Sequence, residues 1–82
     1  MIYIRAKNRQ HAKYYAIEQR IHPNRWLYLD NIDMLRGNHK PVVIVLDSYG
    51  WKENTYNRLV EEERIDLYLD TVQSVVINVT DL

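Results

Sequence analysis

The sequence predicts a single α/β domain over residues 1–82, a minimal Rossmann-like three-layer sandwich with a four-stranded, mainly parallel sheet of order 2-1-3-4. Two observations favour this class. Strand-like and helix-like segments alternate along the chain, which is typical of parallel strands joined by right-handed crossovers. The run Val42–Leu46 contains no polar residue, so we expect a central strand that is covered on both faces.

Four elements are expected before this central strand. Residues 1–6 alternate in polarity as a strand does. Asn8 can cap the start of a helix over residues 9–21. Pro23 ends this helix, because the residue before a proline is pushed out of the helical region. The elements that follow are a short strand at 26–29 and a helical turn from about 30 to 36, which Gly37 terminates.

The second half of the chain is expected to contain a loop, a helix and the last strand. Residues 47–51 are polar and aromatic and should form the loop, and a helix is predicted over 54–64. Residues 65–70 alternate like a strand but also carry a helical apolar face, so we expect a helix or an irregular connector there. Val75–Val79 is the expected last strand. The residues that should pack the helix on the sheet are Tyr56, Leu59 and Val60.

Charge is segregated along the chain, although the net charge is zero. Up to Arg25 there are six Lys or Arg and one acid, which gives +5. From Glu53 onward there are seven acids and two bases, which gives −5. Because the first helix and the later helix should cover opposite faces of the sheet, we expect a basic side and an acidic side.

The composition excludes several classes of protein. The chain has no cysteine, which rules out disulfides and thiolate metal sites. No apolar run approaches the roughly 18 residues of a membrane span, and the N-terminus lacks a signal-peptide pattern. The three histidines form no pair at i, i+3 or i+4, so no metal site is expected. We therefore expect a cytoplasmic protein without metal, cofactor or membrane partner.

A ligand site in an open parallel sheet usually lies at the carboxyl ends of the strands, where the strand order reverses. Here that position is the crevice between the first and third strands, and a small-ligand or nucleotide site there is one alternative for the function. Residues 6–10 contain no glycine, whereas a phosphate-binding loop needs glycines for close backbone approach. No complete catalytic set is present, so we expect a protein that is not an enzyme. The residues expected to line the crevice are Arg5, Lys7, Arg9, Asp47 and Ser48.

The aromatic residues favour a binding role. Seven tyrosines and two tryptophans stand against no phenylalanine, so every large ring carries a polar group suited to interfaces. The leading hypothesis is a non-enzymatic accessory protein that acts by protein–protein binding or self-association. A further alternative is nucleic-acid binding by the basic N-terminal helix, through Lys7, Arg9, Lys13 and Tyr14. The candidate interaction surface consists of Lys13, Tyr14, Tyr49 and Trp51.

Several short motifs carry a resemblance to a known group of proteins. They are Trp26-Leu-Tyr-Leu-Asp, Asp33-Met-Leu-Arg-Gly, Pro41-Val-Val-Ile-Val-Leu and Trp51. In this order they resemble small uncharacterised α/β proteins that are common in bacteriophage genomes. The resemblance implies a Rossmann-like layout and a phage accessory role in the host cytoplasm. It supplies no catalytic residues.

Overall fold

The computed structural model of the chain describes residues 1–51 and 55–80, with the backbone alone at Trp51. Four strands form one sheet in the order β2-β1-β3-β4, and every neighbouring pair is parallel. This confirms the predicted fold class and strand order. The elements are β1 (Ile2–Arg5), α1 (Arg9–Glu18), η1 (Pro23–Arg25), β2 (Trp26–Tyr28), η2 (Ile32–Leu35), β3 (Val42–Leu46), η3 (Asp47–Trp51), α2 (Tyr56–Thr71) and β4 (Val75–Val79), where η marks a 3-10 helix.

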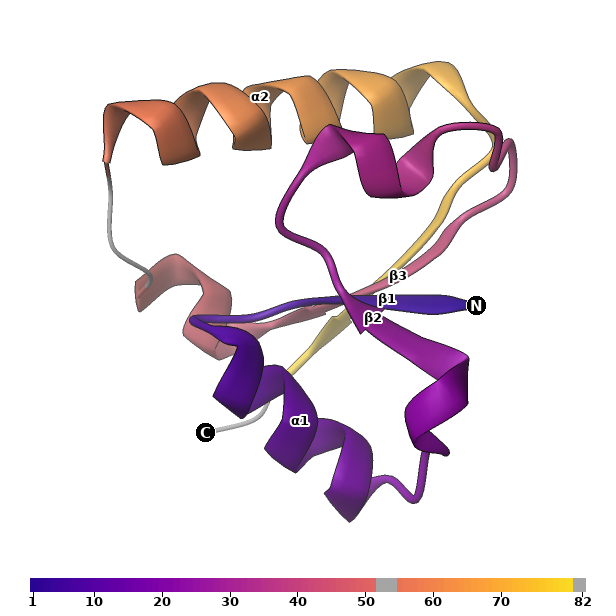
Figure 1. The fold of residues 1–82 in the computed structure, drawn as a ribbon, viewed down its shortest axis with the longest axis vertical. Helices are drawn as coiled ribbons and strands as arrows, with labels where there is room; N and C mark the ends of the chain where they lie inside the picture. The colour runs from indigo at the N-terminus through magenta and orange to yellow at the C-terminus, as the bar shows by residue number, and fades with distance from the viewer. Residues whose placement is uncertain (52–54, 81–82) are drawn as a thin grey trace.

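The two long helices lie on opposite faces of the sheet, with the strands crossing between them (Figure 1). On the α1 face, Ala12 and Ala16 pack on Ile4 and Ile44. On the α2 face, the helix packs on a cluster from the first and third strands and from η2, which includes Leu35. The basic N-terminal helix and the acidic C-terminal helix are therefore separated by the sheet, as predicted.

Helix α1 begins where the sequence predicts and ends earlier. The side chain of Asn8 accepts a hydrogen bond from the His11 N–H, so it caps the start. The helix ends at Glu18, before Pro23 can act. The Arg20 backbone takes a left-handed conformation with φ of 58°, and the Ile21 N–H reaches back 2.8 Å to the Ala16 carbonyl. This bond pattern is a Schellman motif, and it satisfies the last carbonyls of the helix.

Helix α2 corrects the prediction for the second half of the chain. It spans Tyr56–Thr71, so the ambiguous residues 65–70 are helical, while the predicted start at Asn54 lies outside the described residues. The helix packs through Ile65 and Leu69, whereas Tyr56 is 81% exposed. The predicted apolar residues Leu59 and Val60 likewise stay out of the core, the first exposed and the second half-buried.

The reason for this error is that the first half of α2 turns polar side chains toward the sheet. Arg58 and Glu61 lie on the same helical face as Ile65, and both are hydrogen-bonded, Arg58 to the Tyr28 hydroxyl of β2 and Glu61 to the Ile32 N–H of η2. Residues 47–51 are also more regular than the predicted loop, because they form the 3-10 helix η3. Within the described residues, none of the helices has both the length and the apolar composition that crossing a membrane requires.

Candidate functional site

Arg5 stands at the carboxyl end of β1 and is buried, with 7% of its surface exposed. Its Nη1 donates a 2.6 Å hydrogen bond to Asp66 Oδ1 on α2, and the two groups form an ion pair. Its Nη2 donates to the Tyr49 hydroxyl at 2.5 Å, and the guanidinium carbon lies 4.4 Å from the centre of the Tyr49 ring. Arg5 thus joins β1 to η3 and α2.

Tyr49 is held between Arg5 and the acids of α2. Burial is the main cause that raises its pKa from 10.0 to about 12, and the nearby Glu62 and Asp66 raise it further while Arg5 lowers it. The phenol hydroxyl is hydrogen-bonded to Glu62 as well as to Arg5. The phenol is therefore protonated at neutral pH, and its hydroxyl links Arg5 of β1 to Glu62 of α2.

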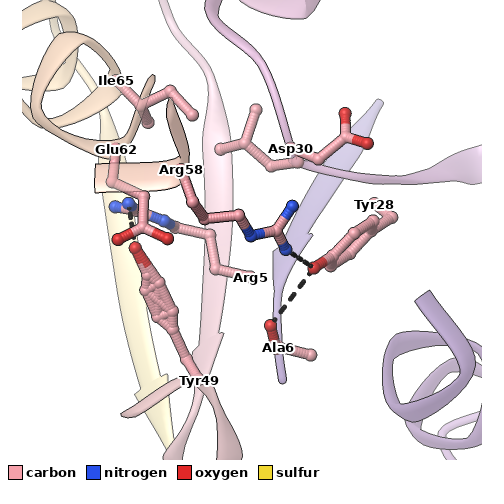
Figure 2. A pocket seen from close by; sticks show the side chains of 9 residues that line it. Arg5, Ala6, Tyr28, Asp30, Tyr49, Arg58, Glu62 and Ile65 are labelled. Atoms are coloured by element: carbon pink, nitrogen blue, oxygen red, sulfur yellow. Dashed lines mark hydrogen bonds between the residues drawn. The ribbon is translucent and has the colours of Figure 1, made fainter. Parts of the chain in front are cut away.

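A second arginine, Arg58 of α2, contacts the carboxyl end of β2 next to Arg5. Arg58 Nη2 donates to the Tyr28 hydroxyl at 2.6 Å, and that hydroxyl lies 3.4 Å from the Ala6 carbonyl oxygen (Figure 2). Glu61 accepts a 3.0 Å hydrogen bond from the Ile32 N–H. Six of the side chains at the ends of the strands form what we call the Arg5 cluster: Arg5, Tyr28, Tyr49, Arg58, Glu62 and Asp66.

The crevice at the carboxyl ends of the strands is filled by the Arg5 cluster. The hollow that remains between Ala6, Asp30 and Ile65 has room for about one water molecule. In Figure 2 the side chains of Arg58, Tyr49 and Glu62 point inward across it. A nucleotide or metabolite would have to displace these side chains in order to bind.

The predicted crevice residues do not all gather here. Arg5 lies at the centre, but Lys7 and Asp47 are exposed and are not among the residues that line the hollow. Arg9 is exposed too, with its guanidinium carbon 5.9 Å from the centre of the Tyr28 ring. Ser48 is fully buried. Among the described residues, no three His, Asp or Glu side chains come together as metal ligands.

The predicted interaction residues also fall in different places. Lys13 and Tyr14 are exposed on α1, whereas Tyr49 belongs to the Arg5 cluster on the α2 face. The sheet separates the two groups. The side chain of Trp51 lies outside the described residues.

Strand β4 is a second candidate site, and it is not among the candidate residues predicted from the sequence. Among the described residues, β4 pairs with β3 on one side and with no strand on the other. Val75, Val76 and Ile77 are 53%, 46% and 45% exposed. We call Val75–Val79, with its open side, the β4 edge.

One signal in the sequence could have identified the β4 edge. No charged residue occurs from Val72 to Thr80, although acids are frequent in the preceding helix. Exposed edge strands are normally protected by charges, prolines or bulges, since an open row of backbone groups recruits another strand. An uncharged, apolar strand placed last in the order 2-1-3-4 is therefore an unprotected edge.

Comparison with protein-family models, with curated proteins and with solved structures gives no match to this chain.

Proposed function

We propose that the protein is a non-enzymatic binding protein that joins another polypeptide by strand addition along the β4 edge. The observation that carries the proposal is the half-exposed apolar run Val75-Val76-Ile77 on a strand with an open side. In strand addition, backbone hydrogen bonds to the edge supply affinity and alternate side chains supply specificity. A phage accessory role, as the resemblance implies, fits such a protein but stays a prediction.

The opposite edge of the sheet supports the proposal by contrast. Strand β2 has only three residues, against five in β4. It follows directly on η1, which contains Pro23, and Arg25 precedes its first residue. Short length, proline and charge are the devices that keep an edge from pairing. The chain thus protects one edge and leaves the other ready to pair.

The Arg5 cluster supports a binding role over a catalytic one. Its two arginines are engaged by side chains of the same chain, and the hollow between them has room for about one water molecule. Its phenol, Tyr49, has a pKa of about 12 and is protonated at neutral pH. We assign the cluster the role of fixing α2 and η3 against the ends of the strands.

Site-specific photocrosslinking tests the proposed function. Asn78 lies on the β4 edge with an exposed side chain, and it can be replaced by benzoylphenylalanine. The matched control carries the same group at Leu67, which is exposed on α2, away from the core residues of that helix. Irradiation in producing cells should give adducts at position 78 whose partner peptides map to a strand-forming segment. Equal or no adduct formation at the two positions would contradict strand addition at β4.

A second candidate function, nucleic-acid binding, is favoured by the outer face of α1. Lys13 and Tyr14 are exposed there, and among the described residues no ion pair joins a cation of α1 to an acid. Free cations beside an aromatic ring suit phosphate contact and base stacking. Binding of labelled single-stranded and duplex oligonucleotides, measured by fluorescence anisotropy, should weaken steeply with salt. It should also weaken in Lys13→Glu but not in the control Arg64→Glu; no binding at low salt excludes this candidate.

A further inference from the structure

We infer that the strand that pairs with the β4 edge is β4 of a second copy of this chain, antiparallel, about a two-fold axis at Ile77. This inference rests on the proposed function and names its partner. The Val75 N–H donates to the Pro41 carbonyl at 2.9 Å, so the backbone of Val75 is directed toward β3.

Backbone polar groups of successive strand residues point to opposite sides of the strand. Ile77 and Val79 are therefore directed toward β3 like Val75, and Val76 and Asn78 direct their N–H and C=O outward. An antiparallel two-fold at Ile77 places Val76 opposite Asn78 of the copy. Each such pair can exchange two hydrogen bonds, which gives about four between the strands.

On the α1 face of the sheet, the side chains match under the same operation. Ile4, Ile44 and Ile77 are register partners, so they point to the α1 face of the sheet. On that face, Ile77 meets Ile77 of the copy, and Val75 meets Val79, so apolar residues face apolar residues. No charge lies between Val72 and Thr80, so no like charges are brought together. The interface is the same patch on both chains, as a two-fold dimer requires.

A second copy also explains where the assembly stops. Pairing β4 with β4 makes one continuous sheet of two copies, and among the described strands the two short β2 strands form its outer edges. Those edges carry the protection of Pro23 and Arg25, so no further copy adds. The side chains of Val75, Val76 and Ile77 are about half-exposed, so a second strand can reach the β4 edge. A strand from a different protein would not require β4 to match its own copy in this way.

A charge-exchange experiment tests the inference. Ile77→Lys and Ile77→Glu each place two like charges opposite one another at the two-fold, about 4.5 Å apart between Cα atoms. By size-exclusion chromatography with light scattering, the wild-type chain should have the dimer mass and each variant half of it, with unchanged circular dichroism. An equimolar mixture of the two variants should recover the dimer mass. The control Leu67→Lys should remain dimeric.

Three results would overturn the inference: a wild-type monomer at every concentration, loss of the dimer in Leu67→Lys as well, or a mixture that stays monomeric. If the wild type is monomeric while position 78 crosslinks to a different protein, the second copy is wrong and strand addition stands. If neither is seen, both proposals fail.

A cysteine variant covers the case in which a charge at position 77 prevents folding. The chain has no cysteine of its own, so Ile77→Cys carries a single thiol. Directly opposed strand residues lie within disulfide range, so mild oxidant should convert this variant to a covalent dimer. Val76→Cys, which faces Asn78 rather than its own copy, should crosslink far less. Equal crosslinking of the two variants, or none, would contradict the register.

Discussion

At the carboxyl ends of the strands, Arg5 is enclosed by Tyr49 and Asp66, and its guanidinium is hydrogen-bonded within the chain. Along β4 the situation is the reverse, since apolar side chains are half-exposed and, among the described residues, no strand lies beside the outward backbone groups of Val76 and Asn78. In most open parallel sheets the first region binds ligands and the edges are protected. Here the usual ligand site is filled, and an edge is open.

The difference between the two regions follows from how much of the sheet the helices of an 82-residue chain can cover. Helix α2 uses its first half to hold the strand ends through polar contacts and its second half, Ile65 and Leu69, to cover β1 and β3. In the part of the chain that the structure describes, β4 therefore keeps Val75, Val76 and Ile77 exposed. The uncovered strand is what makes association with another chain favourable, because burial of apolar surface still remains to be gained.

The largest effect is expected from comparing two register partners, Ile44 and Ile77, on the same face of the sheet. Ile44→Ala should lower the free energy of unfolding by about 3 kcal/mol, because the side chain is buried in the core. Ile77→Ala should lower it by about 1 kcal/mol or less, because 45% of Ile77 is already exposed. Urea unfolding at high dilution, where association is absent, measures both. Equal losses would mean that β4 is packed within one chain.

The next effect concerns the closed region. Arg5→Ala should lower the free energy of unfolding by about 2 kcal/mol, less than for a fully buried pair because Asp66 remains 60% exposed. The control Arg64→Ala removes a surface pair with Glu61 and should change stability by less than about 0.5 kcal/mol. If the two variants unfold at the same urea concentration, the Arg5 cluster does not hold the strand ends together.

A smaller effect is expected from pH. The pKa of Tyr49 is about 12 in the folded chain against 10.0 for a free tyrosine, so the unfolded chain loses this proton first. The stability that this group contributes is complete below pH 10 and is lost as the pH rises through 12. Melting temperatures of the wild type should therefore fall more steeply over this range than those of Tyr49→Phe. Parallel curves would show that Tyr49 is not enclosed as described.

The sheet was predictable because its signals are local. The uncharged run Val42–Leu46 and the alternation of segments determine the strand order, and both can be read from neighbours in the chain. Which face of α2 packs on the sheet was not predictable in the same way. Arg58 and Glu61 face the sheet because they form hydrogen bonds with the Tyr28 hydroxyl and the Ile32 N–H. Those partners are about thirty residues away in the sequence, so helical periodicity alone misplaces the apolar face.

The candidate sites were predictable to different degrees. Strand alternation places Arg5 at the carboxyl end of β1, but its ion-pair partner Asp66 lies 61 residues further on. The lack of charge from Val72 to Thr80 could have marked β4 as an unprotected edge, but apolar residues such as Val75 and Ile77 usually indicate burial. Exposure there depends on where α2 ends its cover of the sheet, which is a property of the packed structure.

Hydrogen exchange at single backbone amides tests the β4 edge most directly. The Val76 and Asn78 amides should exchange slowly in concentrated protein and rapidly after dilution, because pairing with a second copy protects them. The Val75 and Ile77 amides, directed toward β3, should exchange slowly at both concentrations. Rapid exchange at Val76 and Asn78 at every concentration would contradict a paired β4 edge.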